Sequence, residues 1–185
     1  MALKRMDNVL IVVEDLEAVK AFFLELGLKL EGETTVEGPL VGSLIGLKDV
    51  RATLAMLRSP DGHGGIELDK FHTPKAVRYG PVATPMNALG IRRIMFSVDD
   101  IDAVVARMRA HGAELIGEMR YEDAYRLAYI RGPEGIIVGL AEEIRKASPR
   151  TGKRAARPQQ VSRAKPAGRK KTVRKAAGTR KKRKT

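Results

Sequence analysis

The chain has 185 residues, a formal net charge of +13, no cysteine and no tryptophan. The charge is unevenly divided, because residues 145–185 hold 18 of the 35 Lys and Arg residues and no acidic residue. Residues 1–144 therefore carry 17 basic and 22 acidic residues, a net charge of −5. The absence of cysteine excludes disulfides and thiolate metal sites, and no apolar run approaches the ~20 residues of a membrane-spanning helix. Because the N-terminal segment also lacks the apolar core of a signal peptide, we expect a soluble, cytoplasmic protein.

The first 144 residues contain an internal repeat. Residues 6–33 align without a gap with residues 91–118, and nine of the 28 aligned positions are identical. The identical positions include residues typical of helix ends: Asp15 and Asp100 at the expected helix starts, and Gly27 and Gly112 at the expected helix ends. This period predicts two structurally equivalent modules in tandem.

In the first module, residues 3–71, the apolar patterns predict strands over residues 9–13, 28–35, 51–58 and 65–71. Asp15 is placed to cap an amphipathic helix that follows the first strand, and Gly27 to end it. Residues 36–49 form an insert that the second copy lacks, with a short helix expected around residues 40–47. A Pro-Asp-Gly turn at residues 60–62 suits a type I turn before the last strand.

In the second module, residues 90–143, strands are predicted over residues 94–98, 113–121, 125–131 and 136–141. The helix is expected between Asp100 and Gly112, and a Pro-Glu-Gly turn at residues 133–135 again precedes the last strand. Residues 72–89, which contain three prolines, link the modules. Residues 1–144 are therefore predicted to be one α+β domain of two β-α-β-β-β modules, followed by a disordered tail over residues 145–185.

Two helix starts of the form Asp-Leu/Ile-x-Ala-Val and two Pro-Asp/Glu-Gly turns resemble the vicinal oxygen chelate superfamily. This superfamily includes glyoxalases, methylmalonyl-CoA epimerases, extradiol dioxygenases and bleomycin-resistance proteins. The resemblance implies that the two modules curl their sheets around a shared cleft. It also implies a divalent metal bound by residues on the first and last strand of each module. We further expect a homodimer.

By this resemblance, the metal positions are Asn8 and Glu67 in module one, and Arg93 and Gly139 in module two. Only Glu67 is a conventional ligand, because Arg93 is a permanent cation and Gly139 has no side chain. We therefore predict no cofactor, with a divalent metal kept as the alternative. The guanidinium of Arg93 is instead expected to lie near the Glu67 carboxylate, while Arg92 points outward.

The leading functional prediction is binding, or metal-independent conversion, of a small organic molecule in the cleft, with Asn8, Glu67, Arg93 and Tyr125 in the pocket. The catalytic residues, if there is a reaction, are not predicted. One alternative is a glyoxalase-like or epimerase-like metalloenzyme, of the lyase, isomerase or dioxygenase class, that uses Glu67 with unconventional ligands. The other is a nucleic-acid-associated protein that acts through its tail.

The tail resembles the Lys/Ala/Pro-rich tails of linker histones and some bacterial nucleoid proteins. It has no aromatic residue for base stacking, so we expect it to bind DNA or RNA through phosphates, without sequence preference. The expected contacts are its clustered cations: Arg169, Lys170, Lys171, Arg174, Lys175, Arg180, Lys181, Lys182, Arg183 and Lys184. The open alternative is a solubilising tail with no selected partner.

We predict that the full chain binds duplex DNA with micromolar affinity at low salt, with each phosphate contact adding roughly −0.9 to the log–log salt slope. A chain ending at Ile144 should not bind, because it lacks the 18 tail cations. A filter-binding titration at several salt concentrations measures both. Tight binding by the shorter chain would assign the activity to the body instead.

Overall fold

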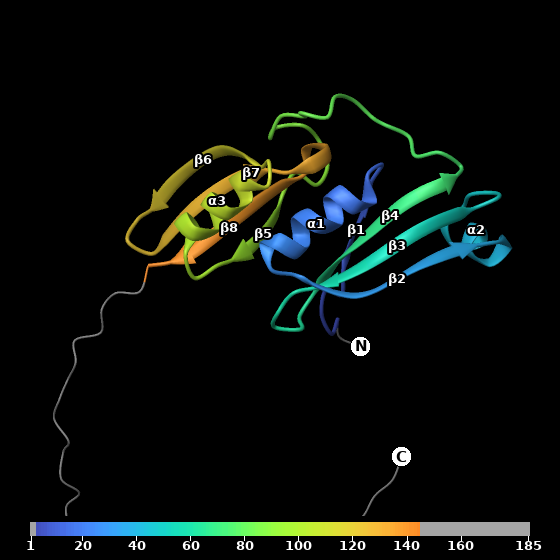
Figure 1. The fold of residues 1–185 in the computed structure, drawn as a ribbon, viewed down its shortest axis with the longest axis horizontal. Helices are drawn as coiled ribbons and strands as arrows, with labels where there is room; N and C mark the ends of the chain where they lie inside the picture. The colour runs from blue at the N-terminus through green and yellow to red at the C-terminus, as the bar shows by residue number, and fades with distance from the viewer. Residues whose placement is uncertain (1–2, 145–185) are drawn as a thin grey trace, which may run out of the picture. The chain divides into compact units, whose positions relative to one another are not determined.

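The computed structural model describes residues 3–144, in which two β-α-β-β-β modules follow each other along the chain (Figure 1). Module one forms a four-stranded sheet in the order β1-β4-β3-β2, with β1 parallel to β4 and the other pairs antiparallel. Its elements are β1 (Val9–Val12), α1 (Leu16–Leu26), β2 (Lys29–Glu37), α2 (Pro39–Ile45), β3 (Arg51–Arg58) and β4 (Gly65–Thr73). The predicted insert helix is therefore α2.

Module two repeats this topology without the insert helix, in the order β5-β8-β7-β6. Its elements are β5 (Ile94–Ser97), α3 (Ile101–Ala110), β6 (Glu114–Tyr121), β7 (Tyr125–Arg131), a 3-10 turn (Pro133–Gly135) and β8 (Ile137–Glu143). The predicted fold is thus confirmed. The tail and its expected nucleic-acid contacts lie outside the described residues. Every helix within residues 3–144 is too short or too polar to cross a membrane.

The residues that match between the two copies determine the local structure. The carboxylates of Asp15 and Asp100 each accept a hydrogen bond at 3.0 Å from the backbone N–H three residues on, which caps α1 and α3. Gly27 ends α1 with a φ of 120°, a conformation that favours glycine. The second and third strands of each module also share a register shift, between Leu30 and Gly32 in one copy and at the matching positions in the other.

The two Pro-acid-Gly turns differ from each other. Both close with a hydrogen bond between the first and fourth residue, from Gly62 N–H to the Ser59 carbonyl at 2.9 Å and from Gly135 N–H to the Gly132 carbonyl at 3.3 Å. In the second, Glu134 has a φ of 52° and a ψ of 21°, which is left-handed and departs from the expected type I turn. The same residue contacts module one. One carboxylate oxygen of Glu134 accepts hydrogen bonds from the backbone N–H groups of Glu14 and Asp15 at 2.8 and 2.6 Å.

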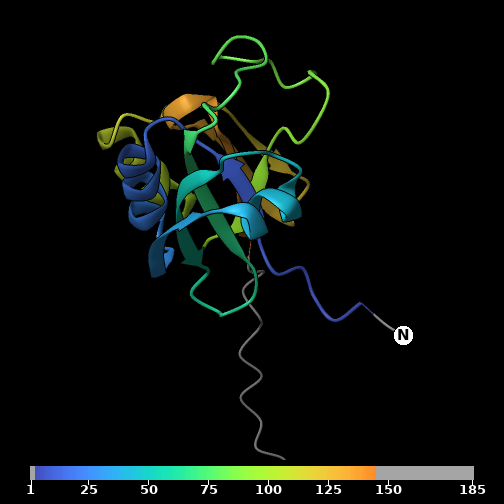
Figure 2. The same ribbon diagram turned by 90° about the vertical axis from the view of Figure 1, so that its right-hand side faces the viewer.

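The two modules share one hydrophobic core. Helices α1 and α3 contact each other and lie on the same side of the sheets (Figure 2). The apolar residues predicted for both helices are buried in a single cluster that joins the modules. At its centre Phe22 packs edge-on against Phe23, with ring centroids 5.3 Å apart. Phe22 also lies so close to Gly132 of module two that a Cβ there would be 2.7 Å from the ring. Association of the modules therefore depends on a side chain from one fitting against bare backbone in the other.

We predict that Gly132→Ala destabilises the domain by about 1–3 kcal/mol, because the added methyl group would overlap a buried aromatic ring. The backbone at Gly132 is extended, so the effect is steric and not conformational. Gly117→Ala is the matched control, because a Cβ there meets no atom within 4 Å. Urea unfolding of both variants measures the difference. Equal stabilities would contradict the packing described here.

Candidate functional site

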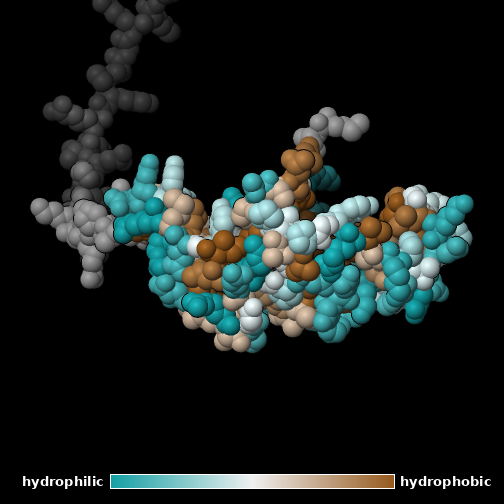
Figure 3. All heavy atoms as spheres, turned by 90° about the horizontal axis from the view of Figure 1, so that it is seen from above, coloured by the Kyte–Doolittle hydropathy of each residue, from teal (hydrophilic) through white to brown (hydrophobic). Residues whose placement is uncertain are grey.

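A cavity of about 420 Å³ lies between the two modules. Its walls are β1, the residues that lead into β5, linker residues 76–82 and Thr84, and the turn that precedes β8. The face seen from the linker side carries hydrophobic patches interspersed with hydrophilic ones (Figure 3). The hydrogen bonds from Glu14 and Asp15 to Glu134 lie at its edge and tie module two to module one. Its volume falls within the roughly 300–1,000 Å³ of small-molecule sites.

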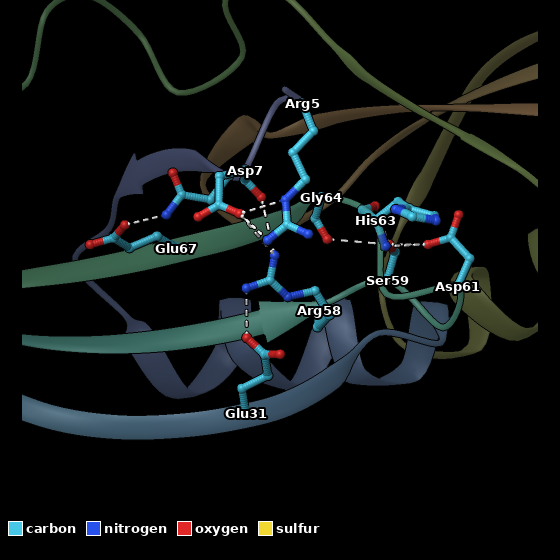
Figure 4. A network of polar contacts seen from close by, with 10 residues as sticks. Arg5, Asp7, Glu31, Arg58, Ser59, Asp61, His63, Gly64 and Glu67 are labelled. Atoms are coloured by element: carbon cyan, nitrogen blue, oxygen red, sulfur yellow. Dashed lines mark hydrogen bonds and ion pairs between the residues drawn. The ribbon is translucent and has the colours of Figure 1, made fainter. Parts of the chain in front are cut away.

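Glu67 and Asn8, two of the four expected metal positions, contact each other directly (Figure 4). Glu67 is half-buried on β4, and its neighbours Ile66 and Leu68 are buried toward the helices. Its side chain therefore lies on the opposite face of the sheet. The amide nitrogen of Asn8 donates to the Glu67 carboxylate at 2.6 Å. Asn8 thus presents a donor, and not its carbonyl oxygen, to the only carboxylate of the set.

A network of charges continues from this pair along the N-terminal segment (Figure 4). Arg58 on β3 donates to the Glu31 carboxylate at 2.8 Å and to the backbone carbonyl of Asp7 at 3.3 Å. Arg5 forms an exposed ion pair with Asp7 at 3.0 Å. Arg58 lowers the pKa of Glu31 through its hydrogen bond. These contacts hold the segment that carries Asn8 against the edge of the sheet.

Arg93 is not paired with Glu67, which corrects the predicted contact. The ion pairs formed within residues 3–144 do not include Arg93, whose guanidinium lies 5.1 Å from the centroid of the Tyr129 ring. Arginine interacts favourably with the electron-rich face of an aromatic ring. Tyr129 lies on β7, two strands from β5 in the sheet, and is therefore the partner of Arg93 that sequence reasoning missed.

Gly139 lies buried on β8, opposite Met95 on β5 and Tyr129 on β7. A Cβ at this position would be 2.9 Å from Met95 and 3.3 Å from Tyr129, so a liganding side chain would have to displace both. The described residues also contain no cluster of three or more His, Cys, Asp or Glu side chains that could hold a metal ion. The donor set around Glu67 does not fit the divalent metal implied by the resemblance.

Tyr125, the fourth expected pocket residue, lies at the start of β7 and is 43% exposed. It faces the same side of the sheet as Tyr129 but is four residues, or about 13 Å, further along the strand. The aromatic ring beside Arg93 therefore belongs to Tyr129. The role of Tyr125 in the pocket stays a prediction.

Arg92 also differs from the prediction, because it does not point freely outward. Its Nε is buried without a hydrogen-bond partner among the described residues, and its Nη2 donates to the Thr84 carbonyl at 3.2 Å. The linker covers this position, and strand alternation alone gives no sign of that cover. Arg92 and Arg93 both line the cavity.

Asp69 is a further candidate that sequence reasoning missed. It lies two residues beyond Glu67 on the same face of β4, is 7% exposed, and its Oδ1 has no hydrogen-bond partner among the described residues. Its neighbours across the sheet are Val12 and Leu54. Burial raises the pKa of Asp69 to about 6, and the charge of Glu67 adds to the effect. The available signal was a second carboxylate two residues beyond Glu67, on the same face of the predicted strand.

We predict that Asp69→Asn stabilises the fold at about pH 7 by about 1–3 kcal/mol. The folded-state pKa of about 6 lies above the unfolded value, so the native state retains a proton that the unfolded state releases. The free energy of unfolding of the parent chain should therefore fall as the pH rises from about 4 to about 6. The difference in this free energy between the parent chain and Asp69→Asn should vanish below about pH 4. Urea unfolding across this pH range measures it, with Asp99→Asn, at an exposed position, as the control. A constant difference at every pH would contradict the burial of an ionising carboxylate.

Residues 5–140 match the model of the Glyoxalase/Bleomycin resistance protein/Dioxygenase superfamily. The crystal structure of a glyoxalase family protein from Bacillus cereus is 52% identical, with a TM-score of 0.74, and the match covers 78% of this chain and 97% of that one. The uncharacterized protein YaeR of Escherichia coli is 29% identical over 147 residues, 77% of this chain and 99% of YaeR. Leishmania major glyoxalase I shares the fold at 23% identity and a TM-score of 0.53, covering 76% of this chain and 88% of that protein. The chain therefore belongs to the Glyoxalase/Bleomycin resistance protein/Dioxygenase superfamily.

Proposed function

We propose that the domain binds, or converts, a small organic molecule in the cavity between its modules, and that it does so without a divalent metal. The observation that carries the proposal is the cavity itself, about 420 Å³ in volume and lined by both modules and by the linker. Pockets of this size that combine apolar walls with a few polar groups are typical of small-molecule sites. Membership of a superfamily that includes glyoxalases and bleomycin-resistance proteins agrees with such a ligand.

The metal-free part of the proposal is supported by the chemistry of the four expected positions. Glu67 is their only carboxylate, and it accepts a hydrogen bond from an amide N–H of Asn8. Arg93 brings a permanent positive charge, which disfavours a second cation nearby. The metalloenzyme alternative would need ligands from outside this set. The homodimer and the nucleic-acid role of the tail stay predictions.

Native mass spectrometry of the full chain as purified tests both parts. We expect a fraction of the protein to carry an organic molecule, and we expect no stoichiometric metal. Ala76→Trp should remove the organic adduct, because Ala76 lines the cavity and the indole would fill it. Ala83→Trp is the matched control, since Ala83 is an exposed residue of the same linker outside the cavity wall.

Two outcomes would contradict the proposal. An adduct retained by Ala76→Trp would place the ligand elsewhere. A stoichiometric divalent ion, whose removal by chelator lowers the melting temperature by several degrees, would support the metalloenzyme alternative. The melting temperature would fall because a ligand that binds the native state stabilises it.

A further inference from the structure

The cavity between the modules contains an imbalance of charge. Its charged lining residues are two carboxylates, Glu14 and Glu134, and three guanidinium groups, those of Arg78, Arg92 and Arg93. Both carboxylates are already engaged. Glu14 forms an ion pair with Arg78 at 2.8 Å, and Glu134 accepts two backbone N–H groups at 2.8 and 2.6 Å.

The other two arginines have no acidic partner within the part of the chain that the structure describes. Arg92 donates only to the Thr84 carbonyl, at 3.2 Å, and that oxygen is also 3.4 Å from a guanidinium nitrogen of Arg131. The Nε of Arg92 is buried and unpartnered. Arg93 lies over the Tyr129 ring, which attracts the cation without neutralising it. Two adjacent guanidinium groups at the wall of the cavity therefore lack an acidic partner, and the charged lining residues together carry a net positive charge.

The rest of the wall is mixed and includes a set of aliphatic residues. These residues come from β1, from the segment that leads into β5 and from the position after the turn before β8: Val9, Ile11, Ile91, Ile94 and Ile136. Such a surface suits the hydrocarbon part of a ligand, which gains by leaving water. Polar groups confined to one part of an apolar pocket usually fix the orientation of the ligand.

We propose that the ligand of this cavity is an amphipathic acid, whose anionic group binds to Arg92 and Arg93 and whose apolar body lies against β1 and Ile94. This inference rests on the proposed function and specifies the class of ligand. A carboxylate or a phosphonate supplies oxygen acceptors for guanidinium N–H groups, including the unpartnered Nε of Arg92, in a charge-assisted contact. A neutral amide of the same shape could accept a hydrogen bond through its carbonyl oxygen, but it would lack the attraction between opposite charges.

The test compares matched probes by isothermal titration calorimetry on the full chain. The acids 4-phenylbutanoate and 3-phenylpropylphosphonate should bind at least about tenfold more tightly than the uncharged 4-phenylbutanamide, because only the acids form an ion pair with the guanidinium groups. Tighter binding of one acid identifies which anion the site prefers. Arg92→Gln and Arg93→Gln should each weaken acid binding by about tenfold or more.

Arg120→Gln is the control, since it removes the same charge from an exposed ion pair with Asp123 and should change the affinity by less than about twofold. This comparison also cancels the attraction that the 18 tail cations exert on any anion. Arg93 is exposed, so its substitution keeps the test informative if Arg92→Gln fails to fold.

Two outcomes would overturn the proposal that the ligand is an anion, while leaving the cavity as a binding site. One is equal affinity for the acids and the amide. The other is acid binding by Arg92→Gln and Arg93→Gln that is as tight as that of the wild type. Failure of all three probes to bind at millimolar concentrations would also overturn the inference. In that case an organic adduct lost in Ala76→Trp would still support the proposed function, whereas the absence of any such adduct would remove both.

Discussion

The packing of α1 against module two is the contact on which the rest of the structure depends. Phe22 lies against the bare backbone of Gly132, and the buried side chains of both helices form one cluster. Neither module could bury its helix as completely without the other, because a four-stranded sheet with one helix is a small core. The cavity follows from this arrangement, since β1 and the residues leading into β5 form parts of the same wall.

Electrostatic contacts then determine what the cavity presents to a ligand. Glu134 accepts hydrogen bonds from two backbone N–H groups of module one, and Glu14 forms an ion pair with Arg78. Both acidic residues of the cavity are therefore engaged in contacts within the protein. The positive charges of Arg92 and Arg93 are left without acidic partners among the described residues. On β4, by contrast, Glu67 and Asp69 form an acidic pair on the opposite face from the helices. This acidic pair is not among the residues that line the cavity, so it lies apart from the two arginines.

Much of the fold was predictable because the internal repeat carries local signals twice. The caps at Asp15 and Asp100 and the end of α1 at Gly27 depend on neighbouring residues, which the sequence displays directly. The partners of Arg92 and Arg93 were not predictable, since they depend on how the linker folds over β5 and which aromatic ring lies two strands away. The burial of Asp69 likewise depends on neighbours from the two strands that flank β4.

The central claim is that an amphipathic acid binds between the modules with its anion on the two arginines. A crystal structure of the full chain with 4-(4-bromophenyl)butanoate tests it most directly, because anomalous scattering locates the bromine without ambiguity. We expect the bromine to lie among the aliphatic side chains of the cavity, and the carboxylate to lie within hydrogen-bond distance of Arg92 or Arg93. Bromine density beside Glu67 and Asp69, or a carboxylate turned away from both arginines, would contradict it.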